Sequence, residues 1–230
     1  MEEKKFLDLV DRELIVALGC TEPIAIAFVA ALAKKHVKGR VIKVKVNASR
    51  NIIKNAMSVC IPGTRSCGIN LAVALGVIKE NPEKKLELLT DLKPEELENA
   101  IEMVRMDIVT VKLSDSAKKL YIEVFIETEI SNSRVIIEDK HNNVILIEVN
   151  DKPLKKRQFN QNIKVKHEDL KPDYLSLNSI LEFIQNVDIK NLHIIKKTID
   201  MNMKISLEGL KRPYGLCVGE VLKIILKQDF

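Results

Sequence analysis

Apolar residues recur along the 230-residue chain with two different spacings, one typical of helices and one typical of strands. A first helix is predicted by apolar residues that recur every four positions, at Phe6, Val10, Leu14 and Leu18. Gly19 follows, as a glycine commonly does just past a helix C-terminus. From Ile24 to Ala33 apolar residues occupy every side of a second predicted helix, which should therefore be buried all round. Thr21 is the expected N-cap of this helix, with Pro23 in its first turn.

Beyond this pair the period changes to two. Strict alternation over 41–47 predicts a half-buried strand. Helical spacing returns over 48–59, over 68–79 and from Pro94 onward. Pro62-Gly63 lies in a predicted loop between the first two of these helices. These patterns define a helical part, 1–106, that contains both the Cys20 junction and the Pro-Gly-Thr loop.

From Asp107 alternation dominates. Short strands separated by polar turns predict a meander of antiparallel strands over 107–152, with Asn142-Asn143 suited to a hairpin turn. A basic, weakly patterned connection follows, and then helices to the end of the chain, the last over 215–227. The predicted fold class is α+β without a Rossmann-type sheet. Residues 153–230 are predicted to form a linker and C-terminal helices that pack back on the first part.

Composition agrees with a folded, water-soluble protein. Hydrophobic residues make up 46% of the chain and the mean hydropathy is −0.01. The longest apolar run is far too short to span a bilayer, and Met1-Glu-Glu-Lys-Lys has no signal-peptide core, so a cytoplasmic location is expected. The net charge of +5 is spread along the chain, and with 4% aromatic residues stacking platforms are scarce. Both observations disfavour nucleic-acid binding.

The candidate chemistry begins at Cys20, between a helix break and the N-terminus of a buried helix. The partial positive charge at that terminus lowers a thiol pKa and favours the thiolate. The alternative is an inert, buried cysteine at a helix junction. The four cysteines (20, 60, 67 and 217) show no zinc-binding spacing. Cys60 and Cys67 flank the Pro-Gly-Thr turn and are either two separate thiols or neighbours across it.

A second candidate site is the loop Pro62–Ser66, which leads into a helix. Backbone N–H groups of Gly63 and Thr64 can converge on a carboxylate or phosphate there, and Arg65 can add a charged fork, although a plain turn explains the loop equally well. One side of the preceding helix carries three polar residues that are either substrate ligands or an exposed face: Asn51, Lys54 and Asn55. Glu22 has the ordinary position of an acidic residue in a first helical turn.

These stretches carry a resemblance to a known family. The segment Ala17-Leu-Gly-Cys-Thr-Glu-Pro-Ile24 resembles the N-terminal signature of the L-cysteine desulfidases, the iron–sulfur relatives of L-serine dehydratase. Asn51-Ile-Ile-Lys-Asn55, Ile61-Pro-Gly-Thr64 and Gly68 agree in order and spacing, and Gly215-Leu216 with Gly219 gives a weaker match. The resemblance runs over the whole chain but covers only the first half of the family's pattern.

The resemblance implies a lyase that eliminates sulfide from L-cysteine, or water from L-serine, through a [4Fe–4S] cluster. Cys20 would be the catalytic base or a cluster-proximal group; Asn51, Lys54, Asn55, Gly63, Thr64 and Arg65 would bind substrate. In the family the cluster cysteines belong to a second half, so the ligands are largely missing from this chain. The expected protein is thus truncated, one part of a split enzyme, or a remnant. The alternative function is a non-catalytic subunit or a module that binds small anions or amino acids.

Overall fold

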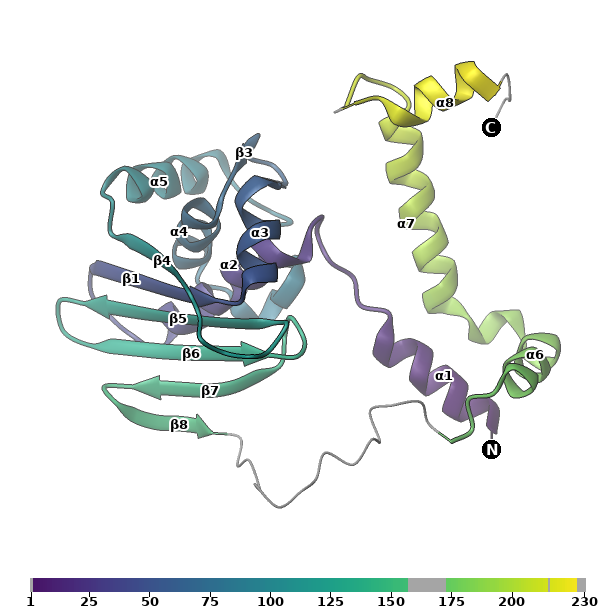
Figure 1. The fold of residues 1–230 in the computed structure, drawn as a ribbon, viewed down its shortest axis with the longest axis horizontal. Helices are drawn as coiled ribbons and strands as arrows, with labels where there is room; N and C mark the ends of the chain where they lie inside the picture. The colour runs from purple at the N-terminus through teal and green to yellow at the C-terminus, as the bar shows by residue number, and fades with distance from the viewer. Residues whose placement is uncertain (1, 157–172, 215, 227–230) are drawn as a thin grey trace. The chain divides into compact units, whose positions relative to one another are not determined.

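The computed structural model describes residues 2–156, 173–214 and 216–226, in two compact units. The sheet unit comprises Val16–Asn162, and the helical unit combines Met1–Ile15 with Ile163–Phe230 (Figure 1). The chain therefore starts in the helical unit, builds the sheet unit and returns. The predicted boundaries at 106 and 152 do not coincide with these units.

Within the described residues, the sheet unit contains a six-stranded mixed sheet of order β4-β1-β5-β6-β7-β8. Its strands are β1 (Val41–Ala48), β4 (Val109–Leu113), β5 (Tyr121–Thr128), β6 (Asn132–Glu138), β7 (Val144–Val149) and β8 (Lys152–Lys156). β1 and β4 run parallel, and every other neighbouring pair is antiparallel. The fold class predicted from the sequence, mixed α and β without a Rossmann-type sheet, is confirmed.

One face of this sheet is covered by helices, as Figure 1 shows. The alternating residues of β1 explain why: Val44, Val46 and Ala48 are buried, while the alternate residues Lys43 and Lys45 are exposed. The helices on this side are α2 (Thr21–Lys35) and α4 (Ile69–Lys79), which contact the sheet, with α3 (Arg50–Ser58), the 3₁₀ helix η1 (Pro82–Glu87) and α5 (Pro94–Arg105) packed against them. The other face carries polar groups such as the pair Tyr121 and Glu123.

Helices α2 and α4 form the centre of the core. All residues of α2 from Pro23 to Ala31 are buried, as the apolar pattern predicted. The two helices pack backbone against backbone at Gly76 of α4, where an added Cβ would lie 2.1 Å from the carbonyl oxygen of Ala27. No side chain fits between backbones at that distance, so this crossing requires glycine.

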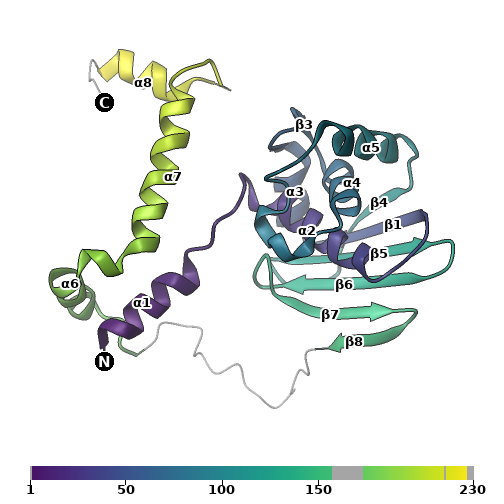
Figure 2. The ribbon, with the colours of Figure 1, turned by 180° about the vertical axis from the view of Figure 1, so that it is seen from behind.

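The helical unit comprises α1 (Glu2–Glu13), α6 (Leu177–Asn186), the 3₁₀ helix η3 (Ile189–Asn191), α7 (His193–Gly209) and α8 (Val218–Leu226). Figure 2 shows α1 beside α6. Phe6 of α1 stacks on Phe183 of α6, with ring centroids 4.8 Å apart, and meets Tyr174 edge-on at 5.3 Å. Among the described side chains of α6, α7 and α8 none is buried, although α8 is strongly apolar.

Three local predictions are wrong. The first helix ends at Glu13 rather than at Leu18, because Phe6 packs on α6 while Leu18 belongs to the sheet unit. Cys20, not Thr21, occupies the N-cap position of α2. The strand that follows Asp107 is not part of an antiparallel meander: β4 lies at the sheet edge, parallel to β1, which separates it from β5.

The remaining differences concern the C-terminal part. Lys152–Lys156 forms strand β8 where a linker was predicted, and residues 157–171 of that linker lie outside the described residues. The last helix is Val218–Leu226; Gly215 and Lys227, at the ends of the predicted helix, also lie outside the described residues. None of the described helices combines the length and apolarity required to cross a membrane.

Candidate functional site

The carboxylate of Glu22 is the centre of a hydrogen-bond network at the N-terminus of α2. The Cys20 thiol donates to Glu22 Oε2 at 3.0 Å, and the Thr21 hydroxyl donates to the same oxygen at 3.2 Å. From helix α3, Asn55 Nδ2 donates to Glu22 Oε1 at 2.8 Å. The network therefore joins Cys20 and Asn55, two residues from separate sequence motifs.

The Pro-Gly-Thr loop adjoins the same junction through Gly19. This glycine has a φ of +69°, and a Cβ added to it would lie 2.7 Å from Cγ of Pro62. Only a residue without a side chain allows this approach. The sequence motifs around Cys20, Asn55 and Pro62 thus meet in one part of the sheet unit, whereas the weaker match at Leu216 and Gly219 belongs to the helical unit.

The charge state of this network differs from the sequence-based expectation. Burial opposes ionisation of Glu22, but the hydrogen bonds from Cys20, Asn55 and Thr21 outweigh it and lower its pKa to about 2. Burial, together with the Glu22 carboxylate, raises the pKa of Cys20. The backbone N–H of Glu22 acts in the opposite direction, as a helix N-terminus should, but is outweighed. Cys20 is therefore a protonated hydrogen-bond donor, and Glu22 is an anion. The prediction that Cys20 is a thiolate is wrong for this arrangement of the two side chains.

His141 is a further member of this neighbourhood that the sequence did not reveal. It lies in the turn between β6 and β7 and is partly buried. Burial lowers the pKa of its imidazole, while the negative charge of Glu22 acts in the opposite direction. The spacing of the four histidines gave no signal for this, because the turn that carries His141 is distant from α2 in sequence.

The loop residues have unequal roles. The hydroxyl of Thr64 is buried and donates to the carbonyl oxygen of Ile61 at 2.8 Å, and it accepts from the N–H of Ser66 at 3.0 Å. Thr64 thus holds the turn together. Gly63 and Arg65 both have positive φ, of 83° and 54°, and both are exposed. The side chain of Arg65 is therefore accessible to an anion.

The polar residues of α3 do not converge on one point. Asn55 reaches Glu22, whereas Asn51, one turn earlier, lines a separate pocket of about 250 Å³ with Ser114, Ser116 and Lys118. Lys54 is exposed. The structure therefore brings Asn55 to Cys20 and places Asn51 elsewhere.

The cysteines do not form a ligand set for an iron–sulfur cluster. Cys60 and Cys67 lie opposite each other in the hairpin β2 (Cys60–Ile61) and β3 (Ser66–Cys67), with Sγ atoms 2.8 Å apart. Cys20 bonds to Glu22, and Cys217 belongs to the helical unit. Among the described residues no group of three or more His, Cys, Asp or Glu side chains is arranged to hold a metal ion. The residues present therefore do not fit a [4Fe–4S] cluster.

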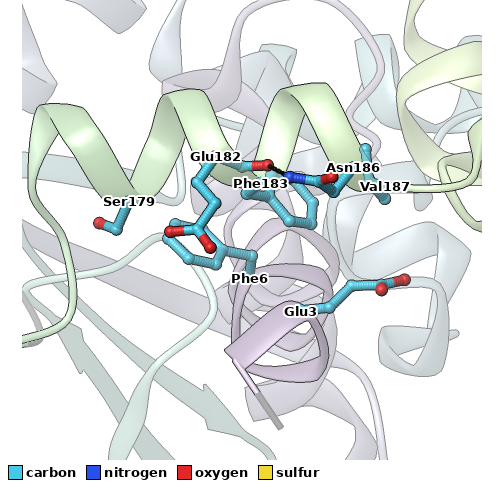
Figure 3. A pocket seen from close by; sticks show the side chains of 7 residues that line it. All are labelled: Glu3, Phe6, Ser179, Glu182, Phe183, Asn186 and Val187. Atoms are coloured by element: carbon cyan, nitrogen blue, oxygen red, sulfur yellow. Dashed lines mark hydrogen bonds between the residues drawn. The ribbon is translucent and has the colours of Figure 1, made fainter.

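The helical unit has a pocket of its own, of about 250 Å³, between α1 and α6 (Figure 3). Its aromatic side chains are the stacked pair Phe6 and Phe183, and Asn186 Nδ2 bonds back to the carbonyl oxygen of Glu182 at 2.8 Å. No residue predicted to be catalytic or substrate-binding lines it. We therefore place the candidate site at Glu22, where the predicted residues meet, and not in this pocket.

The coupling between Glu22 and Cys20 makes a prediction about thiol reactivity. In a Cys60→Ser, Cys67→Ser, Cys217→Ser background, alkylation of the remaining Cys20 should rise with pH at higher values than for an unperturbed thiol, because only the thiolate reacts. Glu22→Gln removes the carboxylate that helps to keep the proton on sulfur, so the pKa of Cys20 should fall and the profile should move to lower pH.

Glu95→Gln is the matched control for this substitution. Glu95 also lies in a first helical turn, that of α5, and is exposed. Its substitution should leave the alkylation profile of Cys20 unchanged. A profile that does not move in Glu22→Gln either would contradict the network described above.

The chain is similar to proteins that are named only UPF0597 protein. The relative from Clostridium perfringens (strain ATCC 13124) is 42% identical over 227 residues, which cover 98% of this chain and 52% of the relative. Relatives from Clostridium tetani and Dichelobacter nodosus are each 34% identical, over 222 and 225 residues. These alignments cover 96% of this chain in both cases, and 52% and 51% of the two relatives.

The chain thus spans about half the length of the curated relatives it matches. The printed name of these relatives states no activity. No protein-family model matches the chain, and no solved structure matches it.

Proposed function

We propose that this chain is part of an amino-acid lyase resembling L-cysteine desulfidase, which eliminates sulfide from L-cysteine to give pyruvate and ammonia. The observation that carries the proposal is the convergence on Glu22 of Cys20 and Asn55, with the Pro-Gly-Thr loop adjoining through Gly19. Cys20, Asn55 and this loop also carry the sequence motifs on which the resemblance to the family rests.

The charges of the site suit an amino-acid zwitterion. Glu22 is an anion and attracts the ammonium group of a substrate, while the exposed guanidinium of Arg65, in the adjoining loop, attracts its carboxylate. Asn55 holds the second Glu22 oxygen and so fixes the orientation of the carboxylate. These are binding and positioning roles that this chain's own residues can perform.

Cys20 is the residue of this site to which we assign proton transfer. Burial and the Glu22 carboxylate raise its pKa, so Cys20 carries its proton and is in the acid form before the reaction. The departing sulfide of L-cysteine needs a proton, so donation matches one requirement of the elimination. Removal of the substrate's α-proton by Cys20 would first require loss of its own proton, which the Glu22 charge disfavours.

The complete enzyme also needs groups that the described residues do not provide. A cluster of the kind that the resemblance implies would have to obtain its ligands from another polypeptide segment. The relatives are about twice as long as the aligned region, and we propose that the counterpart of their remaining half supplies those ligands. The partner is therefore a second segment or subunit, and the substrate is L-cysteine or L-serine.

The test is an anaerobic assay of sulfide and pyruvate release with this chain combined with the remaining half of the Clostridium perfringens relative. We expect L-cysteine to be consumed, and Cys20→Ser to lower the rate by about a thousandfold or more, as removal of a proton-transferring group commonly does. Cys217→Ser, in the helical unit, is the control and should retain activity.

A binding module without catalysis gives a different result. In that case no sulfide or pyruvate forms, and calorimetry detects an affinity for L-cysteine that persists in Cys20→Ser but is lost in Glu22→Gln. If the chain neither binds L-cysteine nor L-serine in these experiments, the assignment of the site to an amino acid is wrong.

A further inference from the structure

The hairpin formed by β2 and β3 places two cysteines directly across from each other. Cys60 and Cys67 are partners in its antiparallel register, and their Sγ atoms are 2.8 Å apart. Directly opposed residues of antiparallel strands have Cα atoms about 4.5–5.5 Å apart. Disulfides span Cα separations of about 4.4–6.8 Å. A bond between these sulfurs therefore requires no rearrangement of the strands.

Both thiols are accessible to reagents. Cys60 and Cys67 are exposed, in contrast to Cys20, which is partly buried and bonded to Glu22. Cys67 also lines a mainly apolar cavity of about 520 Å³ in the sheet unit, whose other lining residues include Met57 and Val104. A small molecule can thus approach the sulfur of Cys67 from the cavity or from solvent.

We propose that Cys60 and Cys67 form a reversible dithiol–disulfide couple whose oxidant is a low-molecular-weight disulfide. The thiolate of one cysteine attacks the small disulfide, whose S–S bond breaks, so that a mixed disulfide forms and one small thiol is released. The second cysteine loses its proton and attacks the protein-side sulfur of this adduct. The Cys60–Cys67 bond forms, the second small thiol leaves, and two electrons have passed from the protein to the oxidant.

The disulfide would close a ring around the Pro-Gly-Thr loop. Residues 61–66 lie between the two cysteines, and the loop contains two exposed residues with positive φ, Gly63 and Arg65. In the reduced state the turn is held by hydrogen bonds such as those of Thr64. Oxidation adds a covalent clamp at the base of the hairpin, so the couple controls how freely this loop moves. This inference does not depend on the proposed lyase activity.

The test exposes the reduced chain to mixtures of oxidised and reduced glutathione, followed by alkylation and peptide mass spectrometry. Wild type should give a Cys60–Cys67 link, with the loss of two hydrogens, and little glutathione adduct. In Cys60→Ser the adduct on Cys67 has no resolving thiol and should accumulate to about tenfold or more above wild type. Cys217→Ser should behave like wild type.

A second readout concerns the loop. Amide hydrogen exchange of residues 61–66 should slow in the oxidised wild type and return to its initial rate after reduction with dithiothreitol. The proposal is overturned if glutathione adducts on Cys67 are as abundant in wild type as in Cys60→Ser, or if the disulfide involves Cys20 or Cys217. It is overturned as a loop clamp if the link forms and exchange in the loop does not change.

Discussion

Gly76→Ala should destabilise the sheet unit more than the same substitution at Gly19 or Gly63. The new Cβ would lie 2.1 Å from the carbonyl oxygen of Ala27 and 2.8 Å from its carbonyl carbon. Both are backbone atoms of a buried helix, so α2 and α4 must separate and lose contacts along their whole crossing. Overpacking of a tight core costs about 3 kcal/mol, and the better helix propensity of alanine returns at most about 1 kcal/mol of this.

The measurement is urea denaturation followed by far-ultraviolet circular dichroism. Gly209→Ala is the matched control, because Gly209 is also helical and an added Cβ there meets nothing within 4 Å. That variant should unfold at the same urea concentration as wild type or at a slightly higher one. An unchanged midpoint in Gly76→Ala would mean that the two helices do not cross as closely as described.

Gly19→Ala should have the second largest effect, because it disturbs both the fold and the site. An alanine at φ +69° carries a backbone cost of about 1–2 kcal/mol, and its Cβ would lie 2.7 Å from Pro62 Cγ. Relief of that contact moves the Pro-Gly-Thr loop away from the Cys20 junction. We expect a loss of about 2 kcal/mol in the free energy of unfolding, together with a reduced affinity for L-cysteine.

Gly63→Ala distinguishes the backbone cost of a positive φ from the steric contact with Pro62. Its φ of +83° imposes a similar backbone cost, but the nearest atom to an added Cβ is Leu92 Cδ2, at an ordinary 3.9 Å. Gly19→Ala should therefore be the more destabilised of the two in urea denaturation, and Pro62→Ala should restore part of the loss in the double variant. Equal stabilities of Gly19→Ala and Gly63→Ala would show that the contact with Pro62 contributes nothing.

Local patterns in the sequence predict the helices and strands well, but they do not predict which of these pack or pair with each other. The all-round apolar run in α2 predicted complete burial correctly, because a helix that is apolar on every side has no face to present to water. Alternation located β1 and β5 but could not reveal that β4 pairs with β1, since register and neighbour depend on distant segments. For the same reason the apolar stripe around Phe6 predicted a helix but not its packing on α6.

For the candidate site too, the sequence predicts residues but not the contacts between them. Cys20 and Asn55 were predicted from motifs, and the structure adds the hydrogen bonds that join both to Glu22. The central position of Glu22 is not visible in the sequence, because an acidic residue in a first helical turn is ordinary and its partner Asn55 is 33 positions away. The thiolate predicted at Cys20 is wrong because burial and the neighbouring carboxylate outweigh the effect of the helix terminus on the pKa of the thiol.

The order of the two units along the chain has a consequence for synthesis. The sheet unit is a continuous segment, whereas the helical unit needs α1 from the start of the chain and α6 from near residue 180. The Tyr174 hydroxyl, for example, bonds to the carbonyl oxygen of Lys5, 169 residues away. On the ribosome the sheet unit can therefore complete its core first, while α1 leaves the exit tunnel with Phe6 uncovered. Chaperones that bind exposed apolar segments would then meet α1 throughout translation, until α6 emerges and covers it.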